Sequence, residues 1–171
     1  MPSGVHRGRF TAALDGDLVV FLIGMRVNQP LKVHKWLPVA TAMPRMLRWL
    51  DAHPEAGLLS WHNAWIKGPA VVQYWRSFED LDRFARAPGE PHLPAWKAFN
   101  RAVRGSGEVG IWHETYQVRA GESEAIYGNM PRMGLALAGR HIPVGSTGQS
   151  AARRINAVEV DAPAVPPYEN P

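Results

Sequence analysis

The chain has 171 residues, with 19 Lys or Arg against 15 Asp or Glu, so its formal net charge is +4 at pH 7. This length favours one domain with additional segments, since domains average about 150 residues. With 46% hydrophobic and 20% charged residues the composition is that of a globular protein, which excludes a wholly disordered or collagen-like chain. No dense Lys/Arg run is present, so we expect no nucleic-acid partner.

Cysteine is absent, which excludes disulfides, thiolate nucleophiles and cysteine-based metal sites. Any metal would therefore depend on His and carboxylate ligands. The longest apolar run, residues 18–25, is much shorter than the roughly 20 residues that cross a bilayer. The first residues also lack the apolar core of a signal peptide. We expect a cytoplasmic protein without a membrane partner.

Three regions differ in composition. Residues 1–16 show no regular apolar pattern, and residues 139–171 are rich in proline and poor in aromatic side chains. Nearly all aromatic residues lie between these two segments. We therefore expect a folded domain over residues 17–138, preceded by an N-terminal segment and followed by a proline-rich tail.

The first half of this domain alternates between strand and helix patterns. Residues 18–27 are apolar and β-branched and end at a turn signal, which predicts a strand. From Trp36 to Leu50 apolar side chains recur every three or four residues, which predicts a helix. Residues 58–66 and 70–75 read as two strands separated by a short turn, and so as a hairpin.

The second half repeats the helix and strand patterns. Ser77 is a suitable N-cap for a helix whose inner face carries Phe78, Leu81 and Phe84. A second helical segment starts near Pro94, and residues 109–118 and 124–130 read as strands. The order β-α-β-β-α-β with an extra strand predicts an α+β, ferredoxin-like split βαβ fold, an antiparallel sheet with helices on one face. Its second face would need cover, so we expect a homodimer whose sheets form a barrel.

Local strings add a resemblance. The run Val72–Leu81, followed by His92, resembles the strand-helix signature of the antibiotic-biosynthesis monooxygenase superfamily of dimeric α/β barrels. More closely, residues 18–132 resemble a little-characterised monooxygenase-like family within it, which has a relative in fumagillin biosynthesis. The strings that carry this closer resemblance are Val33–Trp36, Phe84–Arg86, His92–Trp96, Gly110–Tyr116 and Tyr127–Pro131.

The resemblance implies a role for three residues. In the superfamily the Trp corresponding to Trp75 lines the pocket, and Gln73 would share its face of the strand. His92 stands where the haem-degrading branch has its axial ligand and other members have a histidine at the pocket mouth. A neutral imidazole there would bind iron or move a proton near neutral pH. Core packing of Trp75 and backbone capping by His92 are the alternatives.

Other candidates come from strand alternation. Trp112, Glu114 and Tyr116 share one face and His113 takes the other, and the large amphipathic trio suits a ligand cavity. A structural ion pair of Glu114, with Arg26 or Arg76, is the alternative. Trp61 and Asn63 share a face of their strand, where they would hold a phenolate or oxyanion or merely pack at an edge. Arg26 would bind an anionic group.

These candidates support three hypotheses. The first is a monooxygenase-like enzyme acting on a hydrophobic aromatic or polyketide-like small molecule, without flavin or metal, as the resemblance implies. Its base would be His92 or His113, and its anion would be held by Asn63, Arg26 or Gln73. The second is a haem enzyme with His92 as axial ligand. The third is a non-catalytic protein that binds or carries a small molecule.

Overall fold

The computed structural model describes residues 4–89, 91–103, 105–145 and 148–155. These residues form two compact units. The larger comprises residues 18–117, and the smaller comprises the described parts of residues 1–17 and 118–171. The sequence predicts one domain over residues 17–138. In the structure, residues 118–138 belong to the smaller unit, together with the first residues of the chain.

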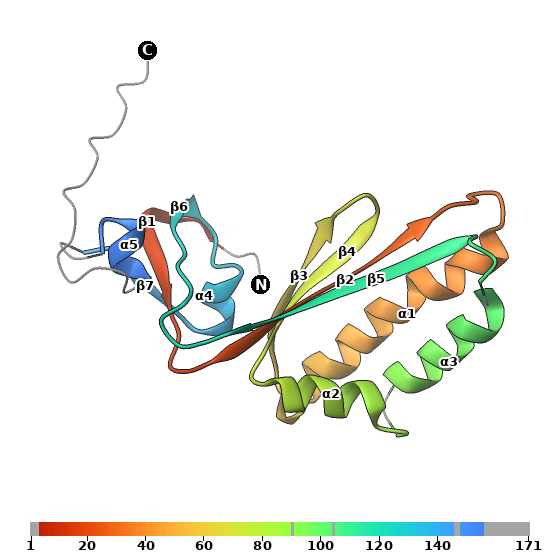
Figure 1. Ribbon diagram of the computed structural model, residues 1–171. Coiled ribbons are helices and arrows are strands. Elements are labelled where there is room, and N and C mark those ends of the chain that lie inside the picture. The colour runs from red at the N-terminus through yellow and green to blue at the C-terminus, as the bar shows by residue number, and fades with distance from the viewer. Residues whose placement is uncertain (1–3, 90, 104, 146–147, 156–171) are drawn as a thin grey trace, which may run out of the picture. The chain divides into compact units, whose positions relative to one another are not determined.

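The larger unit has the predicted order of elements. Its sheet has the strand order β3-β4-β2-β5, in which β2–β4 and β3–β4 pair antiparallel, and its helices lie on one side (Figure 1). This is the ferredoxin-like split βαβ arrangement, so the predicted fold class is confirmed. The elements are β2 (Leu18–Val27), α1 (Val33–Ala52), the short 3-10 helix η1 (Pro54–Ala56), β3 (Leu58–Trp65), β4 (Pro69–Trp75), α2 (Phe78–Arg86), α3 (His92–Val103) and β5 (Val109–Val118).

The helices bury one face of the sheet. One core cluster joins β2 and β4 to α1 and α2, and its centre is Trp75, which is fully buried. A second cluster around Met25, Val103 and Val109 joins β2 and β5 to α1 and α3. Because strand side chains alternate, the odd-numbered residues of β2, β4 and β5 point toward the helices. The even-numbered residues take the opposite face.

The start of α2 follows the sequence prediction. Ser77 caps the helix, since its Oγ accepts a hydrogen bond from the Asp80 backbone N–H at 3.1 Å. The Asp80 carboxylate in turn accepts a hydrogen bond from Arg76 Nε at 2.7 Å and forms an ion pair with Arg83. This cluster fixes α2 beside the end of β4 and so positions the inner face of the helix.

The smaller unit was only partly predicted. Its sheet has the order β6-β1-β7, with β1 (His6–Ala13) paired antiparallel to β6 (Tyr127–Met130) and to β7 (Arg140–Pro143). It also contains the short helices α4 (Leu135–Ala138) and α5 (Ala151–Arg154). The expected extra strand is β6, but it pairs with β1 rather than joining the main sheet. The rest of the expected tail, residues 156–171, lies outside the described residues.

Within the described ranges, no helix is both long enough and apolar enough to cross a membrane.

Candidate active site

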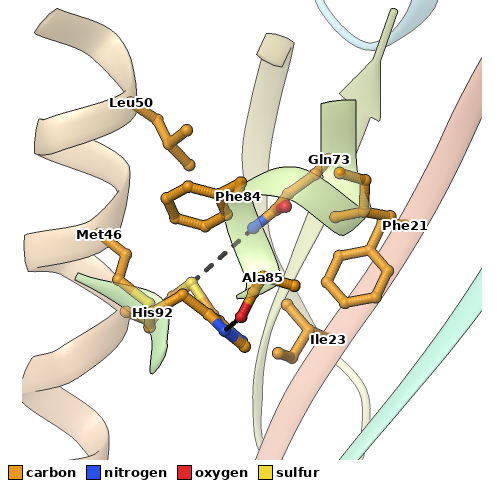
Figure 2. A pocket seen from close by; sticks show the side chains of 10 residues that line it. Phe21, Ile23, Met46, Leu50, Gln73, Phe84, Ala85 and His92 are labelled. Carbon is orange, nitrogen blue, oxygen red and sulfur yellow. Dashed lines mark hydrogen bonds between the residues drawn. The ribbon is translucent and has the colours of Figure 1, made fainter. Parts of the chain in front are cut away.

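A small apolar cavity lies between the sheet and helices α1 and α2 of the larger unit (Figure 2). Its volume is about 30 Å³, roughly the space of one or two water molecules. Two polar side chains, Gln73 and His92, reach it among apolar ones. The lining residues are Phe21 and Ile23 from β2, Met43, Met46 and Leu50 from α1, Gln73 from β4, Leu81, Phe84 and Ala85 from α2, and His92 from α3.

Gln73 carries a fixed carboxamide at this cavity. The side chain is buried, and the indole Nε1–H of Trp75 donates a hydrogen bond to its Oε1 at 2.9 Å. An indole N–H can only donate, so the amide oxygen must be the atom that faces Trp75. The amide nitrogen therefore takes the other side, where Met43 Sδ lies 3.8 Å away as a weak acceptor. Gln73 thus presents N–H donors in apolar surroundings.

His92 is held in one tautomer. Its Nδ1 lies 2.9 Å from the backbone oxygen of Ala85, and a carbonyl oxygen can only accept, so Nδ1 carries the proton (Figure 2). In the neutral ring Nε2 then keeps its lone pair. The imidazole also lies beside the ring of Phe84, with 5.8 Å between centroids. A histidine held this way can accept a proton at Nε2 or bind a metal there.

Trp75 and His113 lie on the same side of the sheet as the cavity without lining it. Trp75 is fully buried in the core cluster. It contacts two residues that line the cavity: it donates a hydrogen bond to Gln73, and its ring packs against that of Phe84 with 5.6 Å between centroids. The ring of His113 lies 5.5 Å from that of Phe21, but the residue is exposed. Trp75 therefore packs in the core, which was the alternative to lining the pocket, and it also donates a hydrogen bond to Gln73 at the cavity.

Trp112, Glu114 and Tyr116 occupy the opposite face of the sheet. Ile111 packs in the core under the helices, so the even-numbered residues of β5 point away from it. The Tyr116 hydroxyl donates to Glu114 Oε2 at 2.5 Å, and this hydrogen bond raises the pKa of the Tyr116 phenol. The cavity described above is lined by side chains from the other face, since the helices enclose only that side. A ligand-binding role for Trp112, Glu114 and Tyr116 stays a prediction.

The remaining candidates lie outside the cavity. The Trp61 indole donates to the Asp51 carboxylate at 2.9 Å, which ties β3 to the end of α1. Asn63 and Arg26 are exposed on their strands. What sequence reasoning missed is the role of Phe21 and Leu50, because an inner-face position predicts burial and does not distinguish a cavity wall from filled core. Met43 and Met46 of α1 also line the cavity.

Residues 18–135 match the family model described as Monooxygenase af470-like. The chain belongs to this family. The match covers the whole of the larger unit and extends through β6. No curated protein matches the chain.

Two solved structures are similar to parts of this chain. An aldoxime dehydratase, OxdRE, crystallised with butyraldoxime, has a TM-score of 0.64 at 17% identity. The alignment covers 81% of this chain and 42% of the dehydratase, so the chain spans about two fifths of that protein. SnoaB, a cofactor-independent oxygenase from Streptomyces nogalater, has a TM-score of 0.42 at 14% identity, with 58% of this chain and 91% of SnoaB covered. At these identities the likeness concerns the fold alone.

Haem is the group that the resemblance implies for one branch of the superfamily. The donor fits, because Nε2 of His92 is the free ring nitrogen. The space does not fit, because about 30 Å³ is far below what a porphyrin needs, and a macrocycle is several times larger than a ring system that the movement of a few side chains would admit. In the part of the chain that the structure describes, no three His, Cys, Asp or Glu side chains gather as a metal site. Haem therefore does not fit this cavity.

Proposed function

We propose that this member of the family is a monooxygenase that oxidises a hydrophobic aromatic or polyketide-like molecule without flavin or metal. The observation that carries this proposal is the pairing of Gln73 and His92 at one apolar cavity: an N–H donor and a ring nitrogen with a free lone pair. A base and an anion-stabilising donor are the two groups that oxidation of a phenol through its anion requires.

In this mechanism His92 Nε2 removes the proton of a phenolic hydroxyl. The N–H of Gln73 donates to the resulting oxyanion, and the apolar walls keep water away from it, which strengthens that hydrogen bond. The electron-rich ring then supplies electrons directly to dioxygen. His92, protonated in the first step, returns its proton to the reduced oxygen.

The reaction balances without an external reductant. In the probe reaction, 1-naphthol and one O₂ give 1,4-naphthoquinone and one water. A ring C–H bond and the O–H bond of the substrate break, and one oxygen atom forms the new carbonyl. The other oxygen atom leaves as water with the two hydrogens, so the substrate itself reduces dioxygen.

Substrate entry requires the cavity to enlarge, since its volume of about 30 Å³ is smaller than an aromatic ring system. Met43 and Met46 line it, and methionine side chains change conformation easily because they are unbranched. We propose that these two side chains yield to the ligand.

The test measures dissolved oxygen with metal-stripped, flavin-free protein and 1-naphthol. We expect oxygen uptake in the wild type and a loss of about a hundredfold or more in His92→Ala, the usual contribution of a general base. His34→Ala is the matched control, because His34 is an exposed histidine on α1 away from the cavity residues. Equal rates of oxygen uptake in the wild type and in His92→Ala would show that His92 is not the base.

Two further binding measurements, one with haemin and one with 1-naphthol, distinguish the other two hypotheses from this proposal. A stoichiometric Soret band on adding haemin, lost in His92→Ala, would replace this proposal with the haem enzyme. Saturable binding of 1-naphthol without oxygen uptake would indicate the non-catalytic binding protein.

A further inference from the structure

We propose that Trp75 is a positioning residue: it fixes the carboxamide of Gln73 so that the cavity selects ligands with a hydrogen-bond acceptor oxygen. This inference rests on the proposed function only in placing the ligand in the same cavity. It names the feature of the substrate that the site recognises, and it assigns a task to a tryptophan that does not line the cavity.

The geometry leaves the amide one favourable orientation. With Oε1 toward Trp75, the indole N–H has an acceptor at 2.9 Å, and the amide nitrogen points toward Met43. If the amide turned over, its NH₂ group would face the indole N–H, and two donors would oppose each other. Both side chains are buried, so water cannot compensate for that loss. The indole therefore determines which end of the amide the ligand meets.

The Gln73 amide nitrogen has only a weak hydrogen-bond acceptor, Met43 Sδ, so its N–H groups are available to a ligand. Met43 Sδ, at 3.8 Å, is a poor acceptor, so a ligand oxygen that replaces it improves the hydrogen bonding of Gln73. An oxyanion gains more than a neutral oxygen, because hydrogen bonds to charged groups are stronger. The cavity therefore prefers phenolate, enolate or carbonyl oxygen over a hydrocarbon of equal size.

The first experiment compares the affinities for 1-naphthol and naphthalene, which differ by one oxygen. The variants are Gln73→Leu, Trp75→Phe and the double variant, each measured by equilibrium binding on the full chain. We expect the preference for 1-naphthol to fall about fivefold to tenfold in Gln73→Leu, as for one hydrogen bond. Trp75→Phe should lose most of that preference, and adding it to Gln73→Leu should cause no further loss.

A merely structural tryptophan gives a different pattern. Trp75→Phe would then weaken both probes equally, or would reduce the 1-naphthol preference as much in the Gln73→Leu background as in the wild type. Either result overturns the inference. The same holds if the wild type binds naphthalene and 1-naphthol equally well, or binds neither.

A measurement on the wild type keeps the inference testable if Trp75→Phe does not fold. In nuclear magnetic resonance spectra, 1-naphthol should move the Gln73 side-chain amide proton signals downfield, and naphthalene should not. The Trp75 indole N–H should exchange with solvent more slowly in the wild type than in Gln73→Leu. Unmoved amide signals or unchanged exchange would overturn the inference.

The two proposals fail separately. Binding selectivity that depends on Trp75 and Gln73, without oxygen uptake, leaves the positioning role standing and rejects the monooxygenase. Oxygen uptake that needs His92 but is accompanied by no preference for 1-naphthol keeps the enzyme and rejects the positioning role.

Discussion

Two histidines have a buried ring nitrogen without a hydrogen-bond partner among the described residues. These atoms are Nδ1 of His62 and Nε2 of His141. Burial lowers the pKa of both imidazoles, and the nearby charges of His6 and Arg132 lower that of His141 further. A depressed folded pKa means that folding favours the neutral ring. Its contribution is present above the unfolded pKa of about 6.5 and is lost as the pH falls through the folded pKa.

We therefore expect the free energy of unfolding to fall between about pH 7 and pH 5. His141→Phe should reduce this dependence, because a phenyl ring keeps the contacts that His141 makes with Phe10 and Tyr127 and takes up no proton. Urea unfolding at the two pH values measures it, with His34→Phe as the exposed control. An equally steep fall in His141→Phe would show that the histidine is not responsible.

The buried carboxylate of Asp80 gives a second prediction at this scale. Burial raises the pKa of this group, but the hydrogen bonds and positive charges of Arg76 and Arg83 lower it by more, so the net pKa is below the ordinary value. Its contribution to stability is therefore present at neutral pH and lost as the pH falls through the folded pKa. Asp80→Asn should destabilise the protein by about 1–3 kcal/mol, since both arginines are half-exposed and screened by water. Thermal unfolding at pH 7 checks this, and an unchanged midpoint would contradict it.

Among the elements, β2 and β5 approach closely on the sheet face opposite the helices. A Cβ on Gly24 would lie 2.7 Å from the indole Nε1 of Trp112, closer than atoms approach without displacement. Gly24 is therefore required by its neighbour, and the contact places Trp112 on the face opposite the cavity. We expect Gly24→Ala to destabilise the protein by about 1–3 kcal/mol.

A double variant separates this contact from loss of backbone freedom. Trp112→Ala removes the obstructing ring, so Gly24→Ala should lower the free energy of unfolding much less in that background. Denaturant unfolding of the wild type, the two single variants and the double variant measures this coupling. Equal costs in both backgrounds would mean that the indole is not what excludes a side chain at Gly24.

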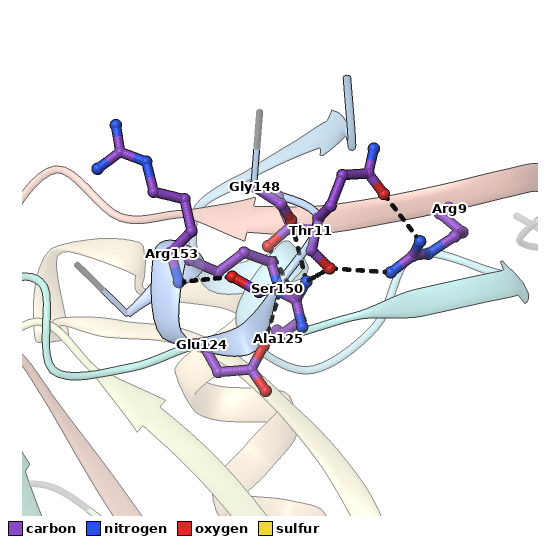
Figure 3. A network of polar contacts seen from close by, with 9 residues as sticks. Arg9, Thr11, Glu124, Ala125, Gly148, Ser150 and Arg153 are labelled. Atoms are coloured by element: carbon purple, nitrogen blue, oxygen red, sulfur yellow. Dashed lines mark hydrogen bonds and ion pairs between the residues drawn. The ribbon is translucent and has the colours of Figure 1, made fainter. Parts of the chain in front are cut away.

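Element by element, the sequence predicts the larger unit better than the smaller one. The bounds of β2, the Ser77 cap and the start of β5 follow from local periodicity and capping, which read short stretches of chain. The smaller unit depends on pairings between distant residues instead. Thr11 donates to the carbonyl of Ala125 (Figure 3), and Arg154 forms an ion pair with Glu124. No local pattern reveals such contacts.

Some features of the candidate site could be predicted from the sequence and others could not. His92 and Gln73 were named from the resemblance and the strand period, and both reach the cavity. The alternation of strand side chains could not decide which face of β5 the helices enclose, and the size of Trp112 favoured the face that the helices leave open. The orientation of the Gln73 amide could not be predicted from the sequence, because it depends on one buried hydrogen bond from Trp75.

For the whole molecule, the sheet face opposite the helices is the feature that remains to be explained. It carries Val20, Leu22 and Val72, which are apolar and half-buried. We propose that a second copy of the chain covers this face. Light scattering at micromolar concentration should then give twice the 18.9 kDa mass of one chain, and Leu22→Glu should give a monomer. A wild-type monomer would contradict the proposal.

The proposed oxidation depends most on His92 acting as a base in a cavity that needs no bound cofactor. The most direct measurement is the ratio of oxygen consumed to 1,4-naphthoquinone formed by metal-stripped, flavin-free protein given 1-naphthol, in the wild type and in His92→Ala. We predict one O₂ per quinone in the wild type, a rate unchanged by a chelator, and a loss of about a hundredfold or more in His92→Ala. Turnover that appears only after haemin or a metal ion is added, or that persists in His92→Ala, would contradict the account.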